Sequence, residues 1–381
     1  MTTTKNNEHK NIKVPNLRFP EFQGEWEKTK FGDIAIVVGG GTPDTKTSQY
    51  WNGRIQWFTP SEIGRNKYVY NSVRTISEEG LNKSSAKLLP IGTILLSSRA
   101  TVGECSINKK ECTTNQGFQS LIPKENISNE FIYYLIQTKR KDLIRKSCGS
   151  TFLEISANEV RKIVVSIPTI KEQDKIAKLL SLLDKRIATQ NKIIDKLQSL
   201  IKGLRVSLMQ IEKGNIVHLG EIAQIYQPQT ISSTELTEDG FLVYGANGII
   251  GKYKQYNHKT EQICITCRGN TCGMVNYTKP MSWITGNAMV INTDEHQNKV
   301  CKRYLYHYLS AYNFNSLISG SGQPQIVRTP LEQLKVTLPT FLEQKQKATF
   351  LDKIQGKIEI CNKALNLYLQ QKQYLLRQMF I

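Results

Sequence analysis

The sequence predicts an α+β fold in which two tandem globular domains are separated by two long helices packed as an antiparallel coiled coil. One observation is an internal repeat: Pro168-Thr169-Ile170-Lys171-Glu172-Gln173 recurs, 171 positions later, as Pro339-Thr340-Phe341-Leu342-Glu343-Gln344. Each copy also opens a long segment with apolar residues at heptad spacing, and the stretch before each copy is strand-like and rich in turns. A pseudo-twofold repeat of this kind predicts a function that needs two related halves.

Five segments follow from these signals. Residues 1–25 are polar, contain two prolines, and are expected to form an N-terminal tail that docks on another surface. Residues 26–168 are expected to form the first globular domain, with a strand-like segment at 31–38, a buried strand at 94–98 and an amphipathic helix at 129–146. A central helix (169–211), a second globular domain (212–339) and a C-terminal helix (340–381) complete the prediction. Each globular domain is long enough to bury its own core.

The second domain repeats the order of the first loosely. Ile263-Cys264-Ile265-Thr266-Cys267-Arg268 corresponds to Ile94-Leu95-Leu96-Ser97-Ser98-Arg99, and Thr285-Gly286-Asn287 corresponds to Thr114-Asn115-Gln116. The two long helices match each other better than the two domains do. This contrast indicates one structural task shared by the helices and a different recognition task for each domain, with uneven drift after an old duplication as the alternative.

Both helices are expected to begin with a capping box, Thr169 with Glu172 and Thr340 with Glu343, each directly after a proline. Apolar residues then alternate spacings of four and three, which is typical of a coiled-coil seam. The seam positions expected to pack are Leu180, Leu183, Ile187, Ile194, Leu197 and Ile201 in the first helix, and Leu351, Ile354, Ile358, Leu365, Tyr368 and Leu375 in the second. Lys347 and Lys372 occupy the same seam near its ends, where a long side chain can reach water.

Connectivity predicts the direction of the two helices. The first leaves domain one and leads to domain two, whereas the second leaves domain two and can only return, so the pair should be antiparallel. A helix of about 36 residues spans roughly 54 Å and would hold the domains apart. An antiparallel pair has an approximate twofold axis, as duplex DNA does, so two basic domains at a fixed separation suit half-sites about 34 Å apart or a little more.

The net charge of the chain limits the class of molecule that it is expected to bind. Lys and Arg number 51 against 32 Asp and Glu, a net charge of +19, which predicts attraction to a polyanion, either nucleic acid or an anionic membrane. The membrane is disfavoured because no apolar run is long enough to span a bilayer, and the first ten residues lack the apolar core of a signal peptide. A cytoplasmic location is therefore expected.

The sequence offers no motif of catalytic chemistry, so no catalytic residue is assigned. Neither the glycine-rich turn and Asn/Asp-Pro-Pro-aromatic loop of an adenine methyltransferase nor a phosphate-binding loop occurs. Cys264, Cys267 and Cys272 resemble half a zinc site, but their segment alternates like a strand and no second ligand pair follows, so no metal is expected. Two alternatives stay open: a self-sufficient nucleic-acid enzyme, such as a fused methyltransferase or nuclease, and a coiled-coil scaffold for RNA or membrane.

Several motifs, in their order, resemble the specificity (S) subunits of type I restriction-modification systems. They are Asn16-Leu17-Arg18-Phe19-Pro20-Glu21-Phe22, the turn Gly40-Gly41-Thr42-Pro43 followed by Tyr50-Trp51, and the doubled Pro-Thr-x-x-Glu-Gln helices. The resemblance covers essentially the whole chain. It departs in the second domain, where Gln227-Pro228-Gln229-Thr230 stands in place of the Gly-Gly-Thr-Pro turn.

This resemblance implies two target recognition domains, each reading one half of a split, asymmetric sequence in double-stranded DNA. It also implies that the coiled coil docks two modification subunits, which methylate adenine, and that restriction subunits join the complex. No cofactor is expected in this chain; S-adenosylmethionine, ATP and Mg²⁺ are expected on the partner subunits.

Candidate DNA contacts are side chains that follow strands or lie in adjacent loops. Arg99 and Arg268 follow matching strands and could present a fork to guanine, or instead contact phosphate or form an ion pair within the domain. Gln116 and Asn287 could face adenine or cap backbone, and the loops 149–152 and 321–325 could approach a groove or simply connect. The full set of candidates is Thr42, Trp57, Thr59, Ser61, Arg99, Gln116, Ser150, Thr151, Tyr244, Asn247, Arg268, Asn287, Ser321, Gln323 and Gln325.

Overall fold

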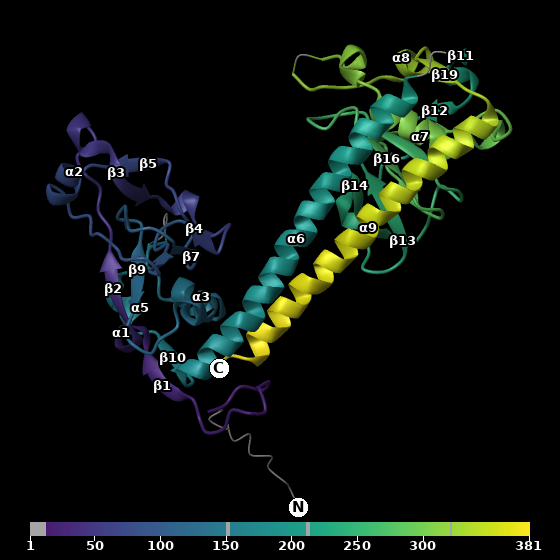
Figure 1. The fold of residues 1–381 in the computed structure, drawn as a ribbon. Helices are drawn as coiled ribbons and strands as arrows, with labels where there is room; N and C mark the ends of the chain where they lie inside the picture. Colours follow the sequence, from purple (N-terminus) through teal and green to yellow (C-terminus); the bar gives the residue numbers. More distant parts are fainter. Residues whose placement is uncertain (1–12, 150–152, 211–213, 321) are drawn as a thin grey trace, which may run out of the picture. The chain divides into compact units, whose positions relative to one another are not determined.

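The computed structural model describes residues 13–149, 153–210, 214–320 and 322–381. The chain divides into two compact units (Figure 1): unit 1 combines Met1–Thr189 with Leu365–Ile381, and unit 2 is Gln190–Ala364. Two long helices, α6 (Ile170–Met209) and α9 (Phe341–Gln378), each contribute to both units. None of the helices in the described ranges combines the length and the apolar character needed to cross a membrane.

Unit 1 is built from three sheets and the helices that cover them. Its strands are β1 (Glu27–Lys30), β2 (Ala35–Gly39), β3 (Trp51–Phe58), β4 (Tyr68–Val69), β5 (Arg74–Ile76), β6 (Ile94–Leu96), β7 (Cys105–Asn108), β8 (Cys112–Thr114), β9 (Gln119–Pro123) and β10 (Val164–Ile167). Its shorter helices are α1 (Phe31–Ile34), α2 (Glu78–Asn82), α3 (Asn129–Thr138), α4 (Arg140–Arg145), α5 (Ala157–Arg161), and the 3₁₀ turns η1 (Ser48–Tyr50) and η2 (Pro60–Glu62). The sheet orders are β1-β10, β2-β9-β6-β7-β4 and β5-β3-β8.

Unit 2 also has three sheets. Its strands are β11 (Asn215–His218), β12 (Gln224–Tyr226), β13 (Phe241–Gly245), β14 (Gly248–Tyr253), β15 (Ile263–Thr266), β16 (Val275–Tyr277), β17 (Trp283–Ile284), β18 (Ala288–Asn292) and β19 (Lys335–Leu338). Its shorter helices are α7 (Lys302–Ala311), α8 (Arg328–Glu332), and the 3₁₀ turns η3 (Leu219–Glu221), η4 (Ser233–Glu235), η5 (Asp294–His296) and η6 (Phe314–Leu317). The sheet orders are β11-β19, β12-β18-β15-β16 and β14-β13-β17.

The two units share one construction, which confirms the predicted α+β class and its internal repeat. An antiparallel pair, β1 with β10 and β11 with β19, joins the first strand of each unit to the strand that leads into a long helix. The larger sheets correspond strand by strand, β2-β9-β6-β7 to β12-β18-β15-β16, and the three-stranded sheets do so as well. The central strands β6 and β15 are buried along their whole length, which explains why their sequences are not polar at alternate positions.

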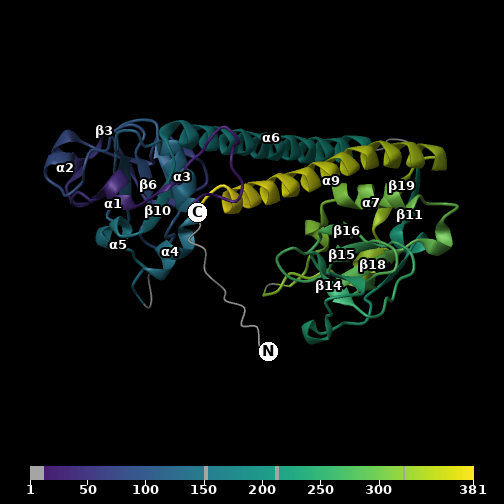
Figure 2. The ribbon, with the colours of Figure 1, turned by 90° about the horizontal axis from the view of Figure 1, so that it is seen from below.

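One helix in each unit packs between the larger sheet and the long helices. In unit 1 this is α3, whose residues Phe131 to Ile136 are all buried and belong to the same core as Ile176 and Leu180 of α6. In unit 2 it is α7, which lies between the four-stranded sheet and α9 (Figure 2) and buries Tyr304 and Leu305. The long helices are thus parts of each core.

Residues 13–26 dock on unit 1 itself. The Arg18 guanidinium makes a two-pronged ion pair with Glu172 at the start of α6, with Nε–Oε1 and Nη2–Oε2 distances of 2.8 Å. The indole N–H of Trp26 donates to the same carboxylate (3.2 Å), and the Leu17 N–H donates to the Gln378 carbonyl at the end of α9 (2.9 Å). This segment therefore ties together the start of α6 and the end of α9.

The two helix starts differ from each other. At α9 the predicted capping box is confirmed: the Thr340 N–H donates to Glu343 (2.9 Å) and the Glu343 N–H donates to the Thr340 hydroxyl (3.4 Å). At α6 the predicted box is wrong, because Arg18 and Trp26 hold the Glu172 carboxylate. A capping box is a local pattern, and here a partner 154 residues away in sequence outweighs it.

A glutamine next to each of these glutamates fixes the long helix to its unit. Gln173 accepts from the N–H of Ser128, the residue directly before α3, and donates to the Pro168 carbonyl, with both bonds 2.9 Å long. Gln344 accepts from the N–H of Cys301, the residue directly before α7 (2.9 Å), and donates to the Pro339 carbonyl (3.0 Å). Both glutamines are only 1% exposed. In the repeated Glu-Gln pair, the glutamine makes the same contacts in both units, whereas the glutamate does not.

Replacing Gln344 with leucine should lower the free energy of unfolding by about 1–3 kcal/mol, because the buried Cys301 N–H loses its acceptor. The loss should appear as faster amide hydrogen exchange in the first turn of α7. Gln346→Leu is the matched control, since Gln346 is exposed on the same helix. Equal exchange in the two variants would contradict this role for Gln344.

Every predicted seam side chain is buried or partly buried. In unit 2 the helices run antiparallel, because the Gln190 amide donates to the Cys361 carbonyl (3.0 Å) whereas Lys347 donates to the carbonyl of Leu208, later in α6 (2.8 Å). In unit 1 Lys372 forms an ion pair with Asp184 (2.8 Å). Each lysine therefore finds an acceptor on the facing helix while remaining partly exposed.

Candidate nucleic-acid interface

The site is built where the central strand of each larger sheet ends. In unit 1 the chain continues from β6 through Ser97 and Ser98 to Arg99, which forms an isolated β-bridge with Glu154. Glu154 also exchanges two backbone hydrogen bonds with Cys148, both 2.9 Å long, and the Ile155 N–H donates to the Ser98 carbonyl (3.0 Å). These bonds place the residues that close the 149–153 loop beside the strand-end arginine.

Unit 2 repeats this arrangement with different side chains. Arg268 follows β15 and forms a β-bridge with Gln325. Gln325 exchanges two backbone hydrogen bonds with Ser319 (2.8 and 2.9 Å), and the Ile326 N–H donates to the Cys267 carbonyl (3.0 Å). Glu154 and Gln325 are 171 positions apart, like the repeated helix starts. The two residues therefore hold equivalent places on one backbone frame.

Glycine opens the closing loop in both units. Gly149 and Gly320 have φ angles of +115° and +94°, in the left-handed region that other residues adopt at a cost. At Gly320 an added Cβ would also lie 2.5 Å from the Gln323 carbonyl oxygen. The backbone conformation therefore favours glycine at both positions.

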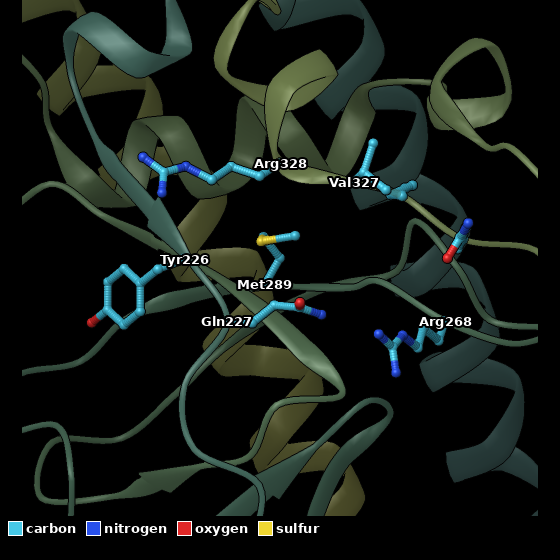
Figure 3. Close-up of a pocket in the computed structure, with 8 residues that line it drawn as sticks. Tyr226, Gln227, Arg268, Met289, Val327 and Arg328 are labelled. Atoms are coloured by element: carbon cyan, nitrogen blue, oxygen red, sulfur yellow. The ribbon is translucent and has the colours of Figure 1, made fainter.

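The side chains on this frame carry different net charge in the two units. Arg99 forms an ion pair with Glu154 at 2.8 Å, and both side chains are partly exposed. Arg268 is exposed and lines a hollow of about 310 Å³ together with Tyr226, Gln227, Met289, Gln325, Ile326, Val327 and Arg328 (Figure 3). No carboxylate is among the residues lining this hollow, and among the described residues none forms an ion pair with Arg268, so unit 2 presents the charge of Arg268 there.

Two neighbours shape the hollow further. The Gln227 amide donates to the Cys267 sulfur (3.1 Å) and to the Gly286 carbonyl (3.2 Å), which fixes its orientation. Arg328, on the opposite side of the hollow from Arg268 in Figure 3, pairs with Glu332 one helical turn along α8 (2.6 Å). Sequence reasoning missed Gln227 and Arg328 as site residues. It also missed Glu154, although the 171-residue spacing from Gln325 was a usable signal.

The remaining candidates divide into exposed and buried side chains. Gln116, Asn247, Asn287 and Gln323 are exposed, as is Ser61, and Thr42 donates its hydroxyl hydrogen to Gln116. Thr59 is partly buried and bonds to Glu62 (2.7 Å). Ser150, Thr151 and Ser321 lie outside the described residues.

The two aromatic candidates are core residues and are corrected here. Trp57 is 4% exposed and donates its indole hydrogen to the Gly41 carbonyl (2.9 Å). Tyr244 is 6% exposed, and its hydroxyl accepts from the Lys279 N–H (3.1 Å). Each ring is packed in a hydrophobic core of its unit, so neither presents a face to a ligand in this structure.

The two cysteines near the site, Cys264 and Cys267, are buried and contribute to packing and hydrogen bonding. Cys264 lies in β15 and is 1% exposed, and burial raises the pKa of its thiol. Cys267 accepts from Gln227, as described above, and its own thiol donates to the Asn287 carbonyl (3.3 Å). Across the described ranges, no group of three or more potential ligand side chains could hold a metal ion.

The fold and this site define a recognition protein: two units present different side chains from one backbone frame on a strongly basic chain. The chain belongs to the type I restriction modification DNA specificity domain family, whose model matches residues 23–199 and 212–369. It is a specificity subunit of a type I restriction-modification system, as its relatives are.

Similar proteins agree with this assignment. The MjaIX specificity subunit of Methanocaldococcus jannaschii is 41% identical over 180 residues, which are 45% of this chain and 42% of that protein. The match therefore spans less than half of that relative's length. The EcoprrI specificity subunit of Escherichia coli is 26% identical over 355 residues, 86% of this chain and 87% of that protein.

Solved structures support the fold. The crystal structure of a type I restriction-modification S subunit from M. genitalium has a TM-score of 0.66 at 17% identity and covers 97% of this chain and 99% of that chain. A chain from a structural study of type I R-M complex assembly and conformational transition has a TM-score of 0.58 at 16% identity, covering 93% and 97%. At these identities the likeness concerns the fold alone.

Proposed function

We propose that each unit reads one half of a split, asymmetric target in double-stranded DNA, and that the paired helices set the spacer between the halves. The observation that carries this proposal is the shared frame at Arg99 and Arg268, on which the adjoining residue differs between units. Equivalent frames suit two half-sites in related geometry, and different side chains suit different base sequences. The net charge of +19 supplies the sequence-independent attraction to phosphates.

The outer faces of the long helices support docking of partner subunits. In unit 1, Leu367 and Tyr374 of α9 are seven residues apart and 64% and 58% exposed, so they lie on one face of the helix. In unit 2, Ile193 and Leu200 of α6 are also seven residues apart and exposed. Exposed apolar side chains repeated on one helix face favour docking of a protein partner there.

The partners that fit are two modification subunits that methylate adenine, together with restriction subunits. In this assignment S-adenosylmethionine, ATP and Mg²⁺ are bound by those partners. The specificity subunit recognises the target, sets the length of the spacer and provides the surface on which the modification subunits dock.

The test is to co-express the chain with its modification subunits and to map adenine methylation in the host genome. We expect one split motif with two defined halves. Deleting one heptad from each of α6 and α9 should shorten the gap by about three base pairs, since seven helical residues span roughly 10 Å. Methylation at unsplit sites, or no methylation with an intact complex, would overturn the proposal.

A further inference from the structure

We infer that the residue bridged to the strand-end arginine, Glu154 in unit 1 and Gln325 in unit 2, determines which bases each unit reads. Resting on the proposed function, this inference assigns Arg268 and Gln325 as a pair that reads purine edges in the major groove. In unit 1, the ion pair with Glu154 keeps the corresponding Arg99 from binding a base. Unit 1 therefore reads its half-site without a free guanidinium at this position.

The backbone frame cannot explain a difference between the units, because it is the same in both. The bridges Arg99 to Glu154 and Arg268 to Gln325 correspond, and so do the paired hydrogen bonds to Cys148 and Ser319. The bonds that Glu154 and Gln325 give to these frames come from their backbone groups. The side chains of Glu154 and Gln325 are therefore free to be chosen for what they contact, without cost to the loop.

The chemistry of the two side chains differs in charge and in hydrogen bonding. A carboxylate only accepts, whereas an amide both donates and accepts, which is the pattern that adenine presents in the major groove. The arginine fork matches the two acceptors of guanine. A partly exposed ion pair such as Arg99 with Glu154 adds little stability, so its main consequence is to cancel the charge that Arg99 would present.

The surroundings in unit 2 favour contact with DNA. The hollow beside Arg268 and Gln325 has a second arginine, Arg328, and an amide fixed in orientation, Gln227. Gln325 is exposed, as Arg268 is, so both can reach a base edge without unfolding the loop. Among the described residues, no carboxylate forms an ion pair with Arg268, in contrast to Arg99.

The experiment exchanges the two residues in the complete complex with modification subunits. Gln325→Glu should reproduce the ion pair of unit 1, change the base preference at one position in the half-site of unit 2, and weaken binding to the original target roughly 10-fold to 100-fold. Glu154→Gln should change one position in the other half-site and leave the half-site of unit 2 unchanged. Methylation mapping and DNA binding at several salt concentrations are the readouts.

Gln297→Glu is the matched control, because it makes the same charge change at an exposed site of unit 2 outside the hollow. Arg268→Lys keeps the charge but loses the fork, so base preference should relax while the salt dependence of binding is kept. A motif unchanged by Gln325→Glu, or uniform weakening on all sequences, would overturn the inference. Absence of any split motif with the unaltered complex would instead refute the proposed function.

Discussion

Replacing Glu172 with glutamine should lower the free energy of unfolding of unit 1 by about 3 kcal/mol. Glu172 is 1% exposed and accepts two hydrogen bonds from the Arg18 guanidinium and one from Trp26, so the variant leaves a largely buried arginine without its counter-charge. Breaking a buried ion pair from one side costs about 3–5 kcal/mol. The lower end applies here, because Arg18 is 17% exposed and keeps its bonds to the Gly24 and Gln23 carbonyls.

The measurement is hydrogen exchange of the full chain, followed in peptides from residues 13–26 and from the first turns of α6. Both should exchange faster in the variant. The repeat supplies the control, Glu343→Gln: Glu343 is exposed and caps only its own helix start, so that variant should be destabilised much less than Glu172→Gln. Similar losses in the two variants would contradict a stabilising role for the ion pair between Glu172 and Arg18.

The architecture was largely predictable, because its signals lie in the spacing of residues. The 171-residue repeat predicted two equivalent units, and heptad spacing placed residues such as Leu180 and Leu351 on packed faces, where both are buried. Helix starts could be placed after Pro168 and Pro339, since proline cannot occupy a helix interior. Each of these signals is local in sequence or strictly periodic.

The polar contacts were not predictable, because each partner is distant in sequence. Glu172 matches Glu343 in the repeat, yet its carboxylate bonds to Arg18 instead of capping its helix. Lys372 looks like a seam residue that reaches water, yet it pairs with Asp184. In both cases the local sequence around the residue is the same with or without the distant partner, so it cannot reveal that partner.

The candidate site was predictable in part. Arg99 and Arg268 were nominated because they follow matching strands of the repeat, and Gln325 because it is an amide in an adjoining loop; the structure bridges Arg268 to Gln325. Trp57 could not be assigned to the core from sequence, because a strand aromatic can face either side. Periodicity locates an element but does not say which of its faces a neighbouring strand covers.

Replacing Asp352 with alanine should lower the free energy of unfolding of unit 2 by about 3 kcal/mol at neutral pH. Asp352 on α9 bonds to Arg303 (Nε–Oδ1 2.9 Å) and accepts from His307 Nε2 (2.8 Å), while His307 Nδ1 accepts from Arg205 Nε of α6 (3.1 Å). This network joins α6, α7 and α9. His307 is fully buried, so loss of the carboxylate leaves its N–H and the Arg303 charge without a partner.

The contribution of Asp352 should depend on pH with a definite sign. Burial opposes its ionisation, but hydrogen bonds from His307 and Arg303 outweigh burial and lower the pKa of Asp352 from 3.8 to about 2. A folded-state pKa below the unfolded value means that the stabilisation is complete above about pH 4 and is lost as pH falls toward 2. Wild type and Asp352→Ala should therefore differ most at neutral pH and converge in acid.

His307 adds a second acid-sensitive step at higher pH. Burial lowers the pKa of His307. Its Nδ1 already accepts a hydrogen bond from Arg205 Nε, so protonation of Nδ1 would place two N–H donors against each other. Unit 2 should thus begin to lose stability as pH falls below about 6.5, before Asp352 titrates. Urea unfolding followed by circular dichroism at pH 7, 5 and 3 tests both steps. Glu359→Ala, an exposed change on the same helix, is the control, and a difference between wild type and Asp352→Ala that stayed constant down to pH 2.5 would contradict the network.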